Sequence, residues 1–199
     1  SFSAFSGFLF LNALYLQEVR GLSAFHTGLC TLPLALATML CSPLSGRLVG
    51  THGTLPSLLV SGSATIVSAL IMTQLTATTP LPILLFNYAL FGVGFGMVNA
   101  PITNTAVSGM PKAQSGLAAA VASTSRQIGA SLGVAVAGTI LGTHIHSGFA
   151  EASHPFWWLV SGGGVTVLLL ACLSNTRWAR DTTRHAAHLL EEAPSGATA

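Results

Sequence analysis

Residues 123–138 read STSRQIGASLGVAVAG, and one basic residue, Arg126, stands in this run of small and apolar side chains. At 100° per residue, the positions around Arg126 are small and those on the far side of the helix are bulky. The small set comprises Ala119, Ala122, Ser123, Gly129, Ala130, Gly133 and Ala137, and the bulky set comprises Leu117, Val121, Ile128 and Leu132. The pattern predicts a helix whose bulky face meets lipid and whose small face, with the arginine, packs on another helix or lines a cavity.

The rest of the chain has the composition of a membrane protein. Of its 199 residues, 51% are hydrophobic and 6% are charged, whereas an ordinary globular domain carries about 25% charged residues. A bilayer crossing needs about 20 predominantly apolar residues, and such runs occupy residues 2–17, 27–49, 56–76, 81–108, 116–142 and 155–175. These runs are too long and continuous for barrel strands. The expected fold is an all-α integral membrane protein with six transmembrane helices.

The two ends of the chain differ from its middle. The first run is short and begins at Ser1 without a methionine or a signal peptide, so we expect this helix to be cut at its start. Residues 177–199 follow the last run and end in EEAPSGATA, which predicts a partly disordered tail.

The basic residues predict an orientation. If the first helix starts in the cytoplasm, the outside connections hold only Arg20, and the inside connections hold Arg47, Lys112, Arg177, Arg180 and Arg184. This positive-inside bias predicts that both ends of the chain are cytoplasmic. We expect the protein to reside in the cell membrane. The formal net charge of +2 gives no support for a nucleic-acid partner.

The run 81–108 contains both polar and flexible positions. Asparagine needs a partner in hydrocarbon, so Asn87, Asn99 and Asn104 should bond to another helix or line a cavity. Glycines in this run allow close helix approach, and its proline should bend it; these residues are Gly92, Gly94, Gly96 and Pro101. Two further prolines, Pro33 and Pro43, predict kinks in the second helix, either structural or serving as hinges.

Arg126 lies about ten residues into its helix, which is about 15 Å deep in a core of about 30 Å. Its insertion there costs about 2.5–3.5 kcal/mol, and none of the six apolar runs contains an Asp or Glu. Its partner is therefore neutral, such as Asn99, Asn104, Gln127 or a backbone oxygen, or it is a carboxylate from outside this sequence. Three roles stay open: a structural or gating hydrogen-bond hub, electrostatics linked to substrate or protons, and snorkelling to the inner surface.

Other motifs give no chemistry. Residues 129–133, G-A-S-L-G, match a nucleophile elbow, but Ser131 is mid-helix with no preceding strand, and no histidine is expected within the last helix to act as its base. His144 and His146 are two possible ligands without a third, so no metal site is predicted. The cysteines, Cys30, Cys41 and Cys172, form no C-x-x-C pair. We predict neither an enzyme nor a bound cofactor.

Four stretches together resemble the major facilitator superfamily, and more narrowly its fourteen-segment drug:proton antiporters of the EmrB/QacA type. They are YLQEVRGLSAFHTGLCTLPLAL (15–36), SPLSGRLVGTHG (42–53), FGVGFGMVNAP (91–101) and GLAAAVASTSRQIGASLGVAVAGT (116–139). The resemblance implies that residues 1–176 are the C-terminal six-helix bundle, with a six-helix N-terminal bundle missing. The family's cytoplasmic loop motif is degenerate: Gly46, Leu48 and Gly53 fit and Arg47 lies nearby, but Gly50, Thr51 and Thr54 replace charged residues.

The resemblance implies proton-coupled efflux of drug-like or amphipathic molecules, with the proton gradient as energy source and alternating access between two bundles. The expected partners are a small-molecule substrate, the lipid bilayer and the missing bundle. The candidate cavity residues are Arg126, Gln127, Asn99, Asn104 and Asn87, with Tyr88 and Phe91 as apolar wall, while Gly129 and Gly133 allow close packing. Two alternatives remain: an exporter of a secondary metabolite, siderophore or lipid-like compound, and a non-transporting membrane scaffold.

Overall fold

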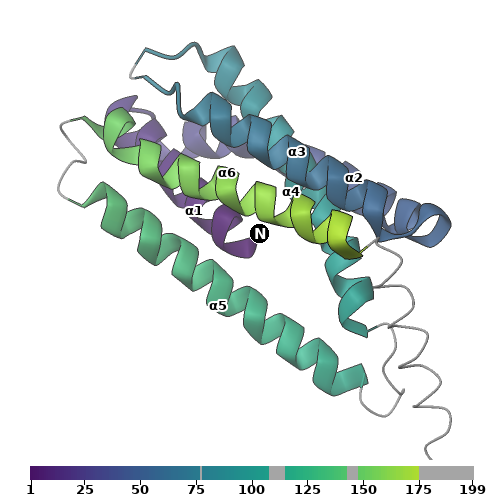
Figure 1. Cartoon of the computed structure of the whole chain (residues 1–199). Coiled ribbons are helices and arrows are strands. Elements are labelled where there is room, and N and C mark those ends of the chain that lie inside the picture. Colours follow the sequence, from purple (N-terminus) through teal and green to yellow (C-terminus); the bar gives the residue numbers. More distant parts are fainter. Residues whose placement is uncertain (77, 108–114, 143–147, 175–199) are drawn as a thin grey trace, which may run out of the picture.

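A computed structural model describes residues 1–76, 78–107, 115–142 and 148–174. These described residues form six α-helices and one π-helical segment and contain no strand, which confirms the predicted all-α fold. The elements are α1 (Phe2–Leu14), η1 (Tyr15–Val19), α2 (Ala24–His52), α3 (Thr54–Met72), α4 (Leu81–Val107), α5 (Ser115–Leu141) and α6 (Phe149–Ser174) (Figure 1).

Four of these helices, α2, α3, α4 and α6, are long and apolar enough to cross a membrane. The other two differ for separate reasons. α1 has 13 residues, below the usual crossing length. α5 has 27 residues, but Arg126, Gln127 and several Ser and Thr residues lower its mean hydropathy. The chain is therefore a multi-pass membrane protein, and the crossings at 2–17 and 116–142 remain predictions.

Two expected helix bounds require correction. The first helix does not continue as an α-helix to residue 17, because a π-helical turn replaces it from Tyr15 onward and the Arg20 amide donates to the Tyr15 carbonyl at 3.1 Å. The last helix begins at Phe149 instead of residue 155, directly after Gly148 with a φ of 80°. Because the helix starts there, His154 lies inside it, contrary to expectation.

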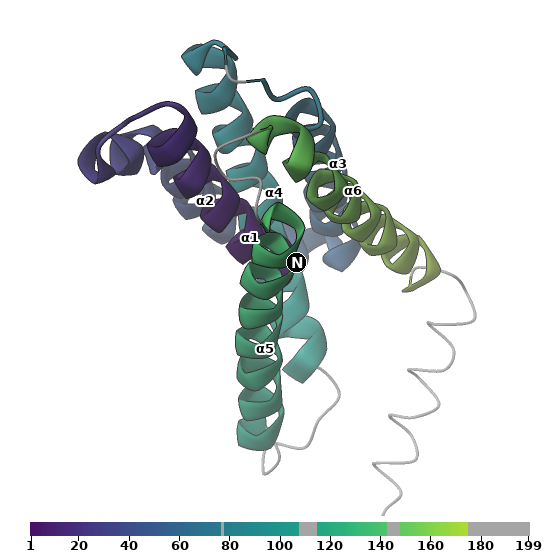
Figure 2. The same ribbon diagram turned by 90° about the vertical axis from the view of Figure 1, so that its left-hand side faces the viewer.

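α4 occupies the centre of the arrangement. α2 packs along one side of it and α3 along another, while α6 packs on the outer side of α3. α5 packs chiefly on α1, and its first half extends beyond the start of α1 (Figures 1 and 2). α5 is thus attached to the other helices along only part of its length.

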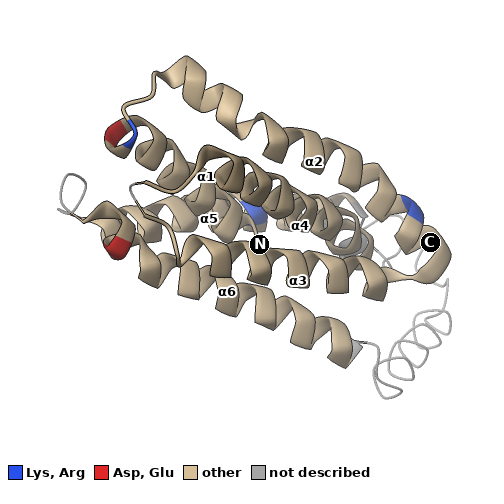
Figure 3. Ribbon diagram, turned by 90° about the horizontal axis from the view of Figure 1, so that it is seen from above, with Lys and Arg blue, Asp and Glu red and all other residues tan. Residues whose placement is uncertain are grey.

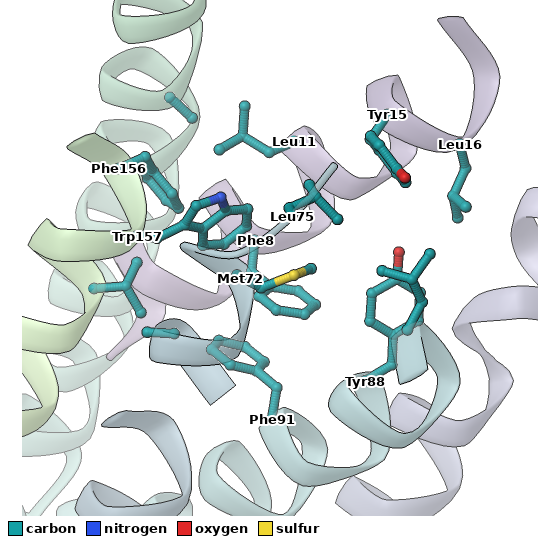
Figure 4. Packing of buried hydrophobic residues seen from close by; sticks show 14 of the residues in the cluster. Phe8, Leu11, Tyr15, Leu16, Met72, Leu75, Tyr88, Phe91, Phe156 and Trp157 are labelled. Atoms are coloured by element: carbon teal, nitrogen blue, oxygen red, sulfur yellow. The ribbon is translucent and has the colours of Figure 1, made fainter. Parts of the chain in front are cut away.

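An aromatic cluster fills the core where α1, α4 and α6 meet (Figure 4). The Phe8 ring stacks on Phe91 with centroids 3.9 Å apart, and it meets Tyr88 and Trp157 edge-on at 5.6 and 5.7 Å. All four side chains are buried. Stacked and edge-to-face pairs stabilise a core beyond the area that they bury, so this cluster fixes α1 against α4.

The three glycines of α4 face different neighbours. A Cβ on Gly92 or Gly96 would meet α2 backbone, and one on Gly94 would meet α3. The close approach lets hydroxyls reach α4 carbonyls: Thr38 of α2 donates to the Gly92 carbonyl at 3.1 Å, and Ser61 of α3 donates to the Gly94 carbonyl at 2.7 Å. These glycines therefore allow both tight packing and interhelical hydrogen bonding.

Pro101 removes one hydrogen bond from α4, and α2 replaces it. Proline has no N–H, so the carbonyl four residues earlier, that of Met97, has no donor within the helix. The buried hydroxyl of Ser45 donates to this carbonyl at 2.7 Å. A neighbouring helix thus satisfies the group that the proline frees, as a membrane interior requires.

Candidate functional site

Arg126 bridges α5 and α4. Its Nη2 donates to the Thr103 hydroxyl oxygen at 2.7 Å, and its Cζ lies 5.4 Å from the centre of the Phe2 ring of α1. The arginine side chain is half-buried, about 16 Å along α5 from Ser115. Arg126 therefore turns toward protein groups on α4 and α1.

Thr103 passes this interaction on to the α4 backbone. Its hydroxyl donates to the Asn99 carbonyl at 3.0 Å, so its oxygen serves the arginine purely as an acceptor. The Asn99 side chain donates to the Phe95 carbonyl at 2.9 Å and is half-buried. Arg126 and Asn99 thus belong to one hydrogen-bonded chain, linked by Thr103. The sequence could have indicated Thr103, because it lies one turn after Asn99 on the same face of α4.

The guanidinium charge has no counterion in the described part of the chain. The carboxylates there belong to Glu18 and Glu151, both at one end of the molecule (Figure 3). Glu18 follows Phe2 by sixteen residues of continuous helix, or about 24 Å. The Nε atom of Arg126 is buried and makes no hydrogen bond there either. The site therefore holds a positive charge whose polar partners are neutral.

Aromatic rings lie beside this charge. Phe2 meets Phe95 edge-on with centroids 5.2 Å apart, and Phe5 stacks on Phe95 at 3.8 Å. A cation over a ring face is stabilised by the ring quadrupole. We call Arg126, Thr103, Phe2, Phe5 and Phe95 the arginine site. Nothing in the sequence pattern pointed to these three phenylalanines.

The two faces predicted for α5 are present in the structure. Leu117, Val121, Ile128 and Leu132 are all more than half exposed. On the other face, Gly133 contacts the Ser3 backbone so closely that a Cβ would clash with it, whereas a Cβ on Gly129 would make an ordinary contact, 3.5 Å from the Phe2 Cβ. The small face thus seats α5 on α1 near the arginine site.

The remaining polar candidates lie elsewhere. Gln127 and Asn104 are exposed, and Asn87 is fully buried with no hydrogen-bond partner for its side chain among the described residues. Tyr88 and Phe91 belong to the aromatic core, where the Tyr88 hydroxyl donates to the Asn12 side-chain oxygen at 2.8 Å. Asn12 was not anticipated, because an asparagine within an apolar run does not show which residue of another helix it bonds.

One cavity of about 680 Å³ opens between α3, α4 and α6 beside Ser1. Of the candidate residues, Pro101 lines it, with Val98, Ile102 and Thr105 on the same helix. The volume falls within the usual range of about 300–1,000 Å³ for small-molecule sites. Arg126 and Asn99 are not in its lining, so the cavity and the arginine site are separate features.

The loop-motif residues lie where α2 turns into α3. Gly46, Arg47 and Leu48 are in the last turns of α2, and Gly53 joins the two helices with a φ of 81°. Arg47 is exposed and lies near the end of α2 that is farther from η1 and its Glu18. Outside the described residues lie the tail 177–199 and the candidates Lys112, Arg177, Arg180, Arg184, His144 and His146.

Within the described residues, the geometry of a serine nucleophile, of a metal site and of a cysteine pair can be compared with the sequence. Ser131 is exposed in the middle of α5, so it is not on a strand-to-helix turn. No group of three His, Cys, Asp or Glu side chains within the described ranges could hold a metal ion. The three cysteines lie on α2 and α6 as free thiols.

Comparison with known proteins gives several relatives whose names concern resistance or export. The chain is 34% identical over 140 residues to the multidrug resistance protein Stp of Mycobacterium tuberculosis, covering 70% of this chain and 26% of Stp. It is 31% identical over 156 residues to the tetracenomycin C resistance and export protein of Streptomyces glaucescens, covering 76% and 29%. It is 33% identical over 124 residues to a tetracycline resistance determinant of Streptomyces rimosus, covering 62% and 36%.

The chain therefore spans roughly a quarter to a third of the curated relatives that it matches. No solved structure matches it. The sequence profile described as Major Facilitator Superfamily matches residues 1–134, which include α1 to α4 and the arginine site. Together with the apolar helices, this match shows that the chain belongs to the Major Facilitator Superfamily.

Proposed function

We propose that this chain is the C-terminal six-helix bundle of a proton-coupled exporter of drug-like, amphipathic molecules. The observation that carries the proposal is the similarity to three proteins whose names concern drug resistance or export. Transporters built from two bundles bind their substrate near the bilayer midplane and rock one bundle against the other. Substrate, the bilayer and an N-terminal bundle are the partners that this architecture needs.

The arginine site supports this proposal by its depth. A charge in the middle of a transmembrane segment marks a functional site by default, because it is costly to place there. Its link to Asn99 through Thr103 gives α4 and α5 a shared polar contact. The apolar runs contain no Asp or Glu, so the proton-carrying carboxylates would come from the other bundle. No cofactor is required, since the proton gradient supplies the energy.

The proposed orientation places both ends of this chain in the cytoplasm of a multi-pass cell-membrane protein. The positive-inside rule supports it, because Arg47 lies at the end proposed to be cytoplasmic. Alkaline phosphatase fused in the full-length protein after Leu22 should be active, and after Gly53 inactive. The reverse activities would overturn this orientation.

Export itself is tested in bacteria that lack their main efflux pumps. The full-length protein should lower the accumulation of ethidium in these cells and raise their resistance to tetracycline. In everted vesicles, which take up the exported compound, collapse of the pH gradient by nigericin should stop the uptake of ethidium. The control variant Ser131→Ala on α5 should export as wild type does, since this hydroxyl is exposed and lies away from Arg126. A well-expressed protein that changes neither accumulation nor resistance would support the membrane scaffold instead.

A second cargo class is favoured by one relative. The Streptomyces glaucescens protein is named for resistance to and export of tetracenomycin C, which supports export of a secondary metabolite. Resistance to such a compound without ethidium efflux would favour this narrower function, whereas efflux of several unrelated dyes would favour the broader one.

A further inference from the structure

We propose that the arginine site is a binding site for a carboxylate, supplied either by an aromatic acid in solution or by an acidic side chain elsewhere in the full-length protein. Four observations carry this inference: the charge without a counterion in the described ranges, the unused donors, the neutral acceptor and the adjoining aromatic group.

Arg126 has more donors than partners. A guanidinium carries five N–H donors, and one hydrogen bond is present, from Nη2 to Thr103. Within the described residues, neither Nε nor Nη1 has an acceptor, and Nε is fully buried. A planar guanidinium matches the two oxygens of a carboxylate, with which it forms two parallel hydrogen bonds. The unused donors therefore fit an acceptor of that shape.

Local groups do not neutralise the charge. Thr103 is a neutral acceptor whose own proton goes to the Asn99 carbonyl. Glu18 is about 24 Å along the helix from Phe2, and Glu151 lies at the same end of the molecule as Glu18 (Figure 3). An unpaired charge at membrane depth is costly, and pairing is the usual solution. A partner that neutralises this charge would have to be an anion.

The surroundings favour a weakly hydrated monoanion. The Phe2 ring lies 5.4 Å from the guanidinium carbon, and Phe95 and Phe5 extend this aromatic group by ring contacts with one another and with Phe2. A phosphate would bring up to two charges into this apolar setting, and its desolvation would cost more than that of a carboxylate. An aromatic acid could place its ring among the phenylalanines and its carboxylate on Arg126.

The test is equilibrium binding of 1-naphthoate to the purified full-length protein, with neutral 1-naphthamide as the matched probe. Wild type should bind the acid at least about tenfold more tightly than the amide. Arg126→Gln should remove that difference, and Arg126→Lys should retain part of it, because lysine keeps the charge but lacks the planar fork. Ser131→Ala should behave as wild type.

A side-chain carboxylate gives a different result. Wild type would then bind acid and amide equally weakly, and Arg126→Gln would lower the melting temperature by leaving an acid unpaired. Replacing each membrane Asp or Glu of the full-length protein by Asn or Gln, in the Arg126→Gln background, should restore that temperature at one position. Such rescue would identify the partner.

Equal binding of the two probes together with no rescuing position would overturn the inference. If Arg126→Gln does not fold, the ratio of the affinities for 1-naphthoate and 1-naphthamide, measured in wild type and in Arg126→Lys, still decides whether the site binds an acid from solution. The inference rests on the proposed function, because it assigns a ligand class to the same exporter. Binding is measured on purified protein and efflux in cells, so the carboxylate site and the export function can each be disproved without the other.

Discussion

α4 and α5 are both 27 residues long, and both combine glycine with polar side chains, but they are held in different ways. α4 receives hydroxyl donors from both neighbours, from Thr38 and Ser45 of α2 and from Ser61 of α3. The carbonyl freed by Pro101 is thus satisfied by a neighbouring helix. α4 is held by hydrogen bonds from both neighbours, although its buried Asn87 side chain has no partner among the described residues.

α5 is seated on α1 through a short stretch of its small face and presents exposed leucine, isoleucine and valine elsewhere. Its arginine reaches α4 through a single side-chain hydrogen bond, to Thr103. In α4 the glycines serve packing and neighbouring hydroxyls donate to its carbonyls, whereas in α5 the small face leaves a charged group with unused donors. The unsatisfied Asn87 side chain of α4 is neutral and fully buried, whereas Arg126 is charged and half-buried, so Arg126 is the group available to a ligand.

The largest effect is expected where α5 meets α1. Gly133→Leu would place a side chain against the Ser3 backbone, which cannot move aside as a flexible side chain could. Overpacking of this kind costs about 3 kcal/mol, so the full-length variant should lose that much free energy of unfolding in mixed SDS–detergent micelles.

Gly138→Ala is the matched control on the same helix, because its nearest neighbour would be the Phe10 ring at 3.9 Å. It should leave the free energy of unfolding close to that of wild type. Equal losses for the two variants would mean that α5 is not seated through Gly133.

A smaller loss is expected where α4 meets α2. A methyl group at Gly92 would meet the backbone of Leu34, so Gly92→Ala should lower the free energy of unfolding by about 2 kcal/mol. Gly162→Ala on α6 enters open space and should be neutral or stabilising by up to about 1 kcal/mol. If Gly92→Ala and Gly162→Ala had the same effect on the free energy of unfolding, α4 would not be tightly packed against α2.

The hydrogen bond from Ser45 to the Met97 carbonyl should be worth less than the glycine contacts, about 1 kcal/mol, in line with interhelical bonds in membranes. Ser45→Ala removes the donor, and its cost should shrink in a Pro101→Ala background, because replacing the proline restores the helical N–H. A double-mutant cycle measures this coupling. Additive losses would show that the serine does not compensate for the proline.

Much of this arrangement could be predicted from local pattern. Apolar runs place the helices, because lipid requires continuous internal hydrogen bonding. Helical periodicity separates the two faces of α5, because side chains repeat every 3.6 residues. The family resemblance, including the stretch around Arg126, agrees with the profile match over residues 1–134.

The partners of the polar residues could not be predicted, because they come from other helices. Thr103 and Phe2 meet Arg126 only through the packing of α4 and α1 against α5. Periodicity also gives no sign of the π-helical turn at Tyr15, whose hydroxyl bonds to the Thr76 carbonyl at 2.6 Å across the bundle. Contacts between distant segments depend on register, which a single helix pattern does not contain.

The smallest effect is expected from the hydrogen bond between Arg126 of α5 and Thr103 of α4. Thr103→Val removes the acceptor of Arg126 but leaves the seat of α5 on α1 intact, so the loss should be about 0.5 kcal/mol. Thr139→Val is its control, because that hydroxyl bonds within α5 to the Ala135 carbonyl. A loss above about 2 kcal/mol for Thr103→Val alone would make Arg126 a structural fastener between α4 and α5. Its spare donors would then no longer argue for a ligand, and the contrast between the two helices would disappear.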